Sequence, residues 1–191
     1  MRTSHFACIA LLGVLCSPLS AQGQGAVCQF RGTADALRER PSPLDSVVVD
    51  LGGESAKLCY GRPSAEGRVM VGGEHPFGTP WEMGANEPTT LHLPFPARVG
   101  SVDLGPGSYS LYAIPGAGEW TIVVNGNPAR WGVPLSADVR AADLGSFSVA
   151  PRQSRERVET LTFSFQPGEQ GAGTLVYEWE GVRLSIPVER R

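Results

Sequence analysis

The chain is poor in lysine, in histidine and in long apolar runs. Lys57 is the only lysine among 191 residues, so nearly all the basic residues are arginine. The formal net charge is −3, and such a mild acidic balance predicts no nucleic-acid partner, because the phosphate backbone requires clustered positive charge. No stretch after residue 21 approaches the roughly 20 consecutive apolar residues of a spanning helix, which predicts no membrane span there.

Motifs of several enzyme classes are also absent. No serine lies in a Gly-x-Ser-x-Gly elbow, and no Walker or dinucleotide-type glycine loop occurs, which argues against that form of nucleophilic catalysis and against nucleotide use. His75 and His92 are not part of any His-x-His or His-Glu-x-x-His motif. Glu74, Glu82 or Glu87 could join them around an ion, but isolated histidines are a weak signal. We therefore predict no metal and no cofactor.

The N-terminus predicts export. A positive residue, an apolar run over 6–15 and small residues up to position 21 are the three parts of a secretory signal peptide. We interpret residues 1–21 as this signal, which predicts a periplasmic or extracellular protein. Lipidation of Cys16 remains an alternative, although the bulky Leu15 directly precedes the cysteine.

Removal of the signal leaves Cys28 and Cys59 as the cysteines of the mature chain. Two thiols in an oxidising compartment favour one disulfide, which would tie an N-terminal arm to an early strand. The alternative is that Cys59 is a small buried residue and Cys28 a free thiol. Residues 22–42 have few apolar side chains and are interpreted as a partly disordered arm, and residues 43–191 as one domain.

The domain has the regularly spaced turns that are typical of an all-β fold. Its short β-rich pieces are separated by turns drawn from 24 glycines and 16 prolines. Over 160–165 the apolar residues alternate with polar ones, as in an antiparallel sheet with one packed face. We predict an antiparallel β-sandwich of roughly eight to eleven strands. The predicted strands are 46–51, 57–60, 68–71, 89–93, 108–114, 120–125, 147–150, 160–165, 174–179 and 183–188.

Three local features complete this prediction. Residues 33–40 are the only stretch with a helical pattern, and Glu180-Gly181 is interpreted as a hairpin turn between the last two strands. A third feature is the long segment 72–90, which is rich in Gly and Pro and too irregular for a strand. Binding residues concentrate on such loops, so this segment is the predicted location of a site.

The candidate ligand-binding residues have different chemical roles. Asn86 and Glu87 could orient a polar ligand, and an arginine could clamp a carboxylate or phosphate. Aromatic rings could supply a stacking wall. The alternative for all of them is structural, as buried ion pairs, loop caps and core tryptophans. The candidates are Arg62, Arg68, Trp81, Asn86, Glu87, Thr89 and Tyr109, with Tyr60 and Trp120 as further wall residues.

Several short motifs between residues 60 and 132 together form a recognisable sequence pattern. They are Tyr60-Gly61-Arg62-Pro63-Ser64, Gly67-Arg68, Pro76-Phe77-Gly78, Trp81, Gly84-Ala85-Asn86-Glu87 with Thr89, Gly107-Ser108-Tyr109-Ser110-Leu111, Ile114-Pro115, Glu119-Trp120 and Trp131-Gly132. Over residues 42–188 the chain resembles the exported bacterial proteins catalogued as domain of unknown function 2911. The resemblance implies a β-sandwich-like fold and an unassigned activity.

The chain departs from that family pattern at two places. The pattern has an arginine directly after the tryptophan, where this chain has Glu82, and an aromatic residue soon after Trp-Gly, where it has Val133 and Pro134. If that arginine belongs to a shared active site, this member would have an impaired or altered activity.

Three functional hypotheses follow. The leading one is a non-catalytic exported module that binds a small polar ligand or an envelope component. The first alternative is a hydrolase of envelope or carbohydrate material that uses loop carboxylates such as Glu82 and Glu87. The second is a purely structural envelope protein, in which Arg62, Arg68, Asn86 and Glu87 would form a buried, fully satisfied network.

Overall fold

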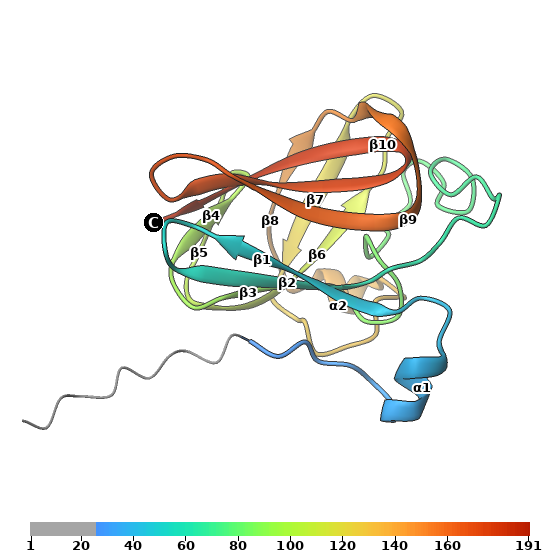
Figure 1. Cartoon of the computed structure of the whole chain (residues 1–191), viewed down its shortest axis with the longest axis horizontal. Coiled ribbons are helices and arrows are strands. Elements are labelled where there is room, and N and C mark those ends of the chain that lie inside the picture. The colour runs from blue at the N-terminus through green and yellow to red at the C-terminus, as the bar shows by residue number, and fades with distance from the viewer. Residues whose placement is uncertain (1–25) are drawn as a thin grey trace, which may run out of the picture.

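The computed structural model describes residues 26–191. The predicted signal peptide and Cys16 lie outside the described residues. Alternation of apolar and polar side chains gives ten strands within residues 26–191, paired antiparallel in two sheets (Figure 1). The predicted all-β sandwich is therefore confirmed.

Each sheet is built from neighbours in space that are not always neighbours in sequence. In order across the first sheet lie β1 (Leu44–Asp50), β2 (Ser55–Gly61), β3 (Thr89–Leu93), β6 (Gly107–Ile114), β7 (Trp120–Asn125) and β8 (Asp143–Val149). In order across the second lie β5 (Val102–Leu104), β4 (Ala97–Val99), β10 (Ala172–Arg190) and β9 (Arg152–Pro167).

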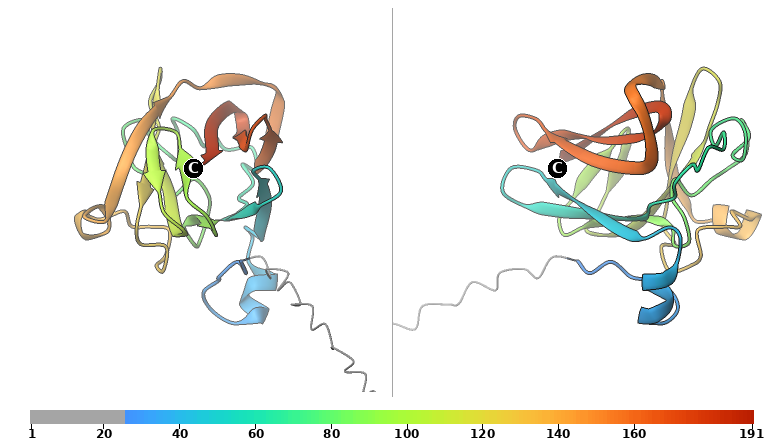
Figure 2. Two further views of the ribbon diagram at one scale, coloured as in Figure 1. Left: turned by 90° about the vertical axis from the view of Figure 1, so that its left-hand side faces the viewer. Right: turned by 45° about the vertical axis from the view of Figure 1, so that its right-hand side comes forward.

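The two sheets curve around one apolar core (Figure 2). In β9, Leu161 and Phe163 are buried while Ser164 between the inward positions is exposed, as the alternation predicts. The largest fully buried side chains include Trp120 of β7 and Trp179 of β10, one from each sheet. Burial of side chains of this size contributes about 1.5–3 kcal/mol each, so the core is the main source of stability.

Two short helices lie outside the sheets. α1 (Ala34–Glu39) confirms the helix predicted over 33–40, and the Thr33 hydroxyl caps it by accepting from the Ala36 backbone N–H. α2 (Ala137–Arg140) lies in the connection from β7 to β8 and was not predicted. None of the helices in residues 26–191 has the length and apolar character needed to cross a membrane.

One strand and one turn predicted from the sequence are wrong. Residues 68–71 form no strand, because the backbone N–H groups of Met70 and Val71 donate to the Glu180 carboxylate instead of to a neighbouring strand. The pair Glu180-Gly181 is no hairpin turn. It lies inside β10, which continues through it with register shifts against β9 on both sides of Glu180, as at a β-bulge.

The segment between β2 and β3 projects from one end of the sandwich, at the right of Figure 1, and then returns to the sheet. It returns at Trp81, which exchanges two backbone hydrogen bonds of 2.8 Å with Ala113 of β6. It also passes so close to β2 that a Cβ on Gly61 would lie 2.0 Å from the Ala85 carbonyl oxygen. Only glycine permits this approach, which presses the segment against the sheet.

Candidate ligand-binding site

A cavity of about 420 Å³ lies between the β2–β3 segment and the end of the N-terminal arm, and we call it the loop cavity. Its volume falls within the range of about 300–1,000 Å³ that is usual for small-molecule pockets. It is lined by Pro41, Ser42, Pro63, Ser64, Glu66, Arg68, Met70, His75, Trp81, Glu82, Gly84 and Ala85.

Trp81 forms one wall of the loop cavity. Its ring stacks on His75 with centroids 4.3 Å apart and on Trp179 of β10 with centroids 5.5 Å apart. The residue is 3% exposed, and its Nε1 is buried without a hydrogen-bond partner among residues 26–191. The tryptophan is therefore rigid, and it has one unused donor.

Glu82 is the next residue along the same wall. It is 5% exposed, and its Oε2 atom is buried with no hydrogen-bond partner in the described part of the chain. Burial raises the pKa of this carboxyl from 4.5 to about 7, and the positive charge of Arg130 only partly opposes the shift. Near neutral pH the group therefore exists in both forms, and it can donate or accept a hydrogen bond.

His75 lies over Trp81 at the same cavity. Burial lowers the pKa of the imidazole, and the nearby Arg68 lowers it further while Glu74 opposes the shift. The ring is therefore neutral at pH 7. An indole N–H, a carboxyl that titrates near neutrality and a neutral imidazole make this wall suited to hydrogen bonding with a polar ligand rather than to attracting an ion.

Of the two candidate arginines, one lines the loop cavity and one does not. Arg68 does, and its Nε and Nη2 donate to the Ala65 and Ser64 carbonyl oxygens at 2.9 Å each. Arg62 instead donates to the Leu161 carbonyl oxygen of β9 at 3.2 Å. It also forms an ion pair with Asp45 of β1 at 3.2 Å. Arg62 therefore links strands on either side of it.

Asn86 and Glu87 hold the N-terminal arm. The Asn86 side-chain amide donates to the Ser42 carbonyl oxygen at 3.3 Å. Both Glu87 carboxylate oxygens accept from Arg40 Nη1, at 3.0 and 2.8 Å, and Oε1 also accepts from the Arg31 backbone N–H at 2.7 Å. Glu87 is 6% exposed, so this is a buried ion pair. Loss of one partner of such a pair costs about 3–5 kcal/mol.

The remaining candidates have partners away from the loop cavity. The buried Thr89 hydroxyl donates to the Met83 carbonyl oxygen at 3.1 Å, and the Tyr109 hydroxyl donates to the Gly105 carbonyl oxygen at 3.0 Å. Trp120 lies in the core. Of the seven candidates, the structure thus brings Arg68 and Trp81 together at one cavity and ties the others to the fold.

Glu82 was predicted from the sequence as a departure from the family pattern and as an alternative catalytic carboxylate, but not as a binding residue. Its environment depends on Gly132, fifty positions away, because a Cβ there would lie 2.7 Å from the Glu82 Cγ. The only local signal is its place between the apolar Trp81 and Met83, both buried.

The histidines considered for a metal site are apart. His75 stacks on Trp81, whereas His92 Nδ1 shares a hydrogen bond of 2.7 Å with the Ser108 hydroxyl on the neighbouring strand. No group of three or more His, Cys, Asp or Glu residues within 26–191 is placed to hold a metal ion.

Comparison with known proteins gives one match. No curated protein and no solved structure matches the chain. One protein family does, over residues 42–188, a range that begins at the end of the arm and includes all ten strands except the last two residues of β10. The chain therefore belongs to the family described as "Protein of unknown function (DUF2911)".

Proposed function

We propose that this protein is an exported, non-catalytic binding module that holds a small polar ligand in the loop cavity. The observation that carries the proposal is that two adjacent residues of one cavity wall, Trp81 and Glu82, each keep a buried polar atom without a partner. Each such atom costs about 1–3 kcal/mol. A ligand that supplies the missing partners would recover this free energy on binding.

The chemistry of the wall defines the ligand. The Trp81 N–H requires a hydrogen-bond acceptor, and the Glu82 carboxyl accommodates a donor or an acceptor because its pKa is about 7. Among residues 26–191, Arg68 is the one arginine that lines the cavity, and the carboxyl groups of Glu66 and Glu82 on the same wall oppose its attraction for an anion. A neutral molecule with hydroxyl or amide groups fits this arrangement best.

Export is supported by the disulfide between Cys28 and Cys59, because such bonds persist in oxidising compartments. The predicted signal peptide agrees with this location. An envelope component remains part of the proposal as a possible source of the polar ligand.

Hydrolysis is the second candidate function, and one observation favours it. A carboxyl with a pKa of about 7 is suited to general acid–base catalysis near neutral pH. A pair of carboxylates would require a second member. Glu87 is held in its ion pair with Arg40 and does not line the loop cavity, and Glu66, which does line it, is exposed to solvent and lacks the burial of Glu82. We therefore favour binding over catalysis.

The indole N–H signals of the four tryptophans provide a direct test in ¹⁵N NMR spectra of the mature protein. Assignment of the Trp81 signal comes from the Trp81→Phe variant. Titration with a panel of monosaccharides, small amides and amino acids should shift the Trp81 indole signal for the compounds that bind. The Glu82→Gln variant should change the affinity for those compounds, because the amide cannot reproduce both protonation states of the acid.

Arg183→Gln is the matched control, since Arg183 pairs with Glu178 on β10 and does not line the loop cavity. This variant should show the same Trp81 signal shifts and the same ligand affinities as the wild type. The proposal fails if no compound of the panel moves the Trp81 signal, or if Glu82→Gln leaves every measured affinity unchanged. Release of a hydrolysed product from any compound, with loss of that activity in Glu82→Gln, would favour the hydrolase instead.

A further inference from the structure

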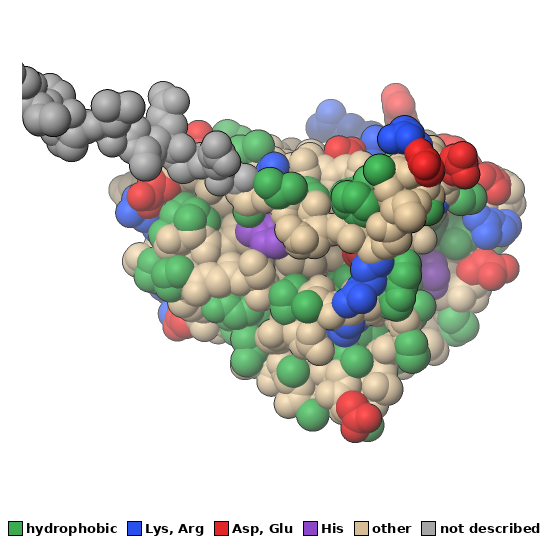
Figure 3. Space-filling model, turned by 90° about the horizontal axis from the view of Figure 1, so that it is seen from below, with side chains coloured by type: hydrophobic (Ala, Val, Ile, Leu, Met, Phe, Trp, Pro, Cys, Tyr) green, Lys and Arg blue, Asp and Glu red, His purple; other side chains and the backbone are tan. Residues whose placement is uncertain are grey.

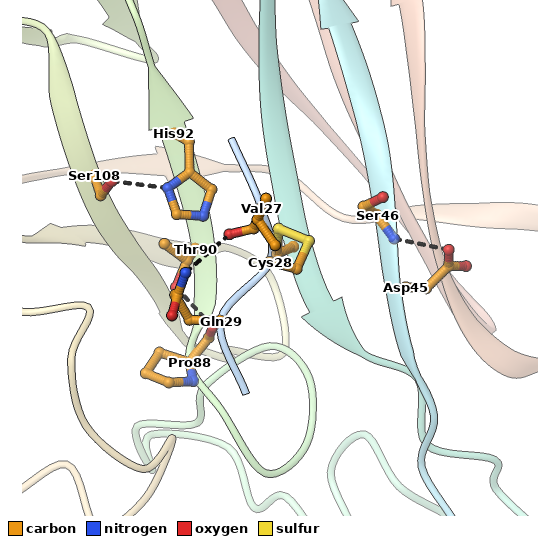
Figure 4. The surroundings of a disulfide bond; sticks show 10 residues. Val27, Cys28, Gln29, Asp45, Ser46, Pro88, Thr90, His92 and Ser108 are labelled. Carbon is orange, nitrogen blue, oxygen red and sulfur yellow. Dashed lines mark hydrogen bonds between the residues drawn. A yellow bond between two sulfur atoms is a disulfide. The ribbon is translucent and has the colours of Figure 1, made fainter. Parts of the chain in front are cut away.

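The N-terminal arm covers part of the outer face of the first sheet and encloses a second cavity of about 360 Å³, which we call the arm cavity. Cys28 of the arm is bonded to Cys59 of β2, and the arm runs beside β3 (Figure 4). Farther along, Arg31 and Arg40 are held by Glu87. The arm is thus fixed at three points, and the cavity has a permanent wall.

Much of the arm cavity is apolar. Phe30 of the arm, Leu44 of β1 and the prolines Pro88 and Pro128 contribute hydrophobic surface to it. The molecular face that carries the arm shows hydrophobic side chains interspersed with basic ones (Figure 3). An apolar molecule of matching size would be stabilised here by about 25 cal/mol for each Å² that it removes from water.

Two arginines, Arg31 and Arg130, add positive charge to this apolar wall. Neither forms an ion pair with any residue in 26–191. Arg31 donates one of its five side-chain N–H groups to the Ala129 carbonyl oxygen, and its guanidinium lies 5.9 Å from the Trp131 ring centroid. It therefore keeps donors for a ligand.

The Arg130 guanidinium is held in place by the backbone. It donates to the carbonyl oxygens of Asn127, Trp131 and Gly132 at 2.7–3.1 Å and to the Ser110 hydroxyl at 3.2 Å. Burial lowers its pKa, and the nearby acidic groups Glu82, Tyr112 and Asp143 oppose this shift without forming an ion pair. Its positive charge is fixed in position and only partly compensated.

The other polar groups of the cavity wall do not change this balance. Burial, and next the charge of Lys57, lower the pKa of His92, so its ring is neutral at pH 7. Figure 4 shows this ring beside Ser108, its hydrogen-bond partner. The Glu87 carboxylate also lines the cavity, but its charge is compensated by Arg40 at 2.8 Å.

We infer that the arm cavity is a second ligand site, which binds a small amphipathic carboxylate. The carboxylate lies against Arg31 and Arg130, and the apolar body lies against Phe30, Leu44 and Pro128. Guanidinium groups suit carboxylates because their N–H donors match the two oxygens. This site is separate from the loop cavity and does not depend on the function proposed for it.

The test is calorimetric titration of the oxidised mature protein with octanoate, beside 1-octanol as a neutral probe of the same chain length. Octanoate should bind more tightly than 1-octanol, and added salt should weaken octanoate alone. Arg31→Gln should lower octanoate affinity by about tenfold, the equivalent of about 1.4 kcal/mol for a charge-assisted hydrogen bond. Arg38→Gln is the matched control, because Arg38 of α1 pairs with Asp35 and does not line the arm cavity.

The location of binding is read from the indole signals. Octanoate should shift the Trp131 indole signal, because Arg31 lies over that ring, and should leave the Trp81 signal in place. The inference is overturned by the absence of octanoate binding, by equal affinity for 1-octanol, or by an unchanged affinity in Arg31→Gln. A shift of Trp81 alone would overturn it too and would assign the binding to the loop cavity, so the two proposals fail separately.

Discussion

At the scale of single residues, Glu82 is the side chain whose burial most clearly opposes the stability of the fold. A carboxylate buried without a hydrogen-bond partner is unfavourable, and proteins relieve the cost by binding a proton. The fold tolerates this group beside Trp81, whose Nε1 is also unpartnered. The two residues together place two unpartnered polar atoms at the wall of the loop cavity.

The raised pKa of Glu82 predicts a pH dependence of stability. A carboxyl with a folded pKa of about 7 and an unfolded value of 4.5 binds its proton more tightly in the folded state. Its contribution is fully present below about pH 4.5 and is lost as the pH rises through about 7. At about 1.36 kcal/mol per pKa unit, this loss amounts to about 3 kcal/mol.

Urea unfolding at pH 5 and pH 8 measures this effect. The free energy of unfolding of Glu82→Gln relative to wild type should be higher at pH 8 than at pH 5 by about 2.5 kcal/mol, because glutamine does not ionise. Glu119→Gln, at an exposed position, is the control and should follow the wild type at both pH values. An equal difference at both pH values for Glu82→Gln would show that Glu82 does not titrate in this range.

At the scale of elements, β10 acts as an anchor for the β2–β3 segment. Its bulge places the Glu180 carboxylate, 6% exposed, where Oε2 accepts from the backbone N–H groups of Met70 and Val71 at 2.9 Å each. Oε1 accepts from Arg157 of β9 at 3.2 Å. One side chain thus replaces the strand pairing that residues 68–71 lack.

Glu180→Ala should therefore lower the free energy of unfolding by about 2–4 kcal/mol, because two backbone donors lose their acceptor. Alanine has the same difficulty as glutamate with the positive φ of 52° at this position, so the substitution isolates the side chain. Amide hydrogen exchange should also accelerate at Met70 and Val71.

Glu178→Ala is the matched control for this substitution. Glu178 lies two positions away on β10 and forms a partly exposed ion pair with Arg183 at 2.8 Å. Its loss should cost about 1 kcal/mol or less. Equal costs for the two substitutions would contradict the anchoring role of Glu180.

At the scale of the whole molecule, the disulfide joins the N-terminal arm to the first sheet across 31 positions of sequence. The cross-link restricts the unfolded chain, and a closed loop of this length predicts a stabilisation of about 3–4 kcal/mol. It also holds the arm over the outer face of the sheet, which forms one wall of the arm cavity.

Comparison of the wild type with Cys28→Ala tests this role. Under oxidising conditions the variant should be less stable by about 3–4 kcal/mol. Under reducing conditions the two proteins should be nearly equal, because both then lack the bond. Amide hydrogen exchange over residues 29–42 should be faster only in the samples that lack the bond, which are the variant under either condition and the wild type under reducing conditions. A persistent difference under reducing conditions would show that Cys28 stabilises the fold by packing instead of by cross-linking.

The sequence by itself determined the features that depend on near neighbours or on composition. Alternating residues in 160–165 specified a strand with one buried face, because successive side chains point to opposite sides. Residues 33–40 specified a helix, which the Thr33 cap supports. Two cysteines in a predicted exported chain favoured the disulfide that the structure contains.

Only the tertiary structure decided what depends on residues distant in sequence. Glu180-Gly181 has the composition of a turn, but it became a bulge because Glu180 finds the Met70 and Val71 amides about 110 positions earlier. The burial of Glu82 requires its contact with Gly132, and the assignment of Glu87 to the arm requires Arg40. Solvation and hydrogen bonding act between neighbours in space, so chain order alone does not reveal them.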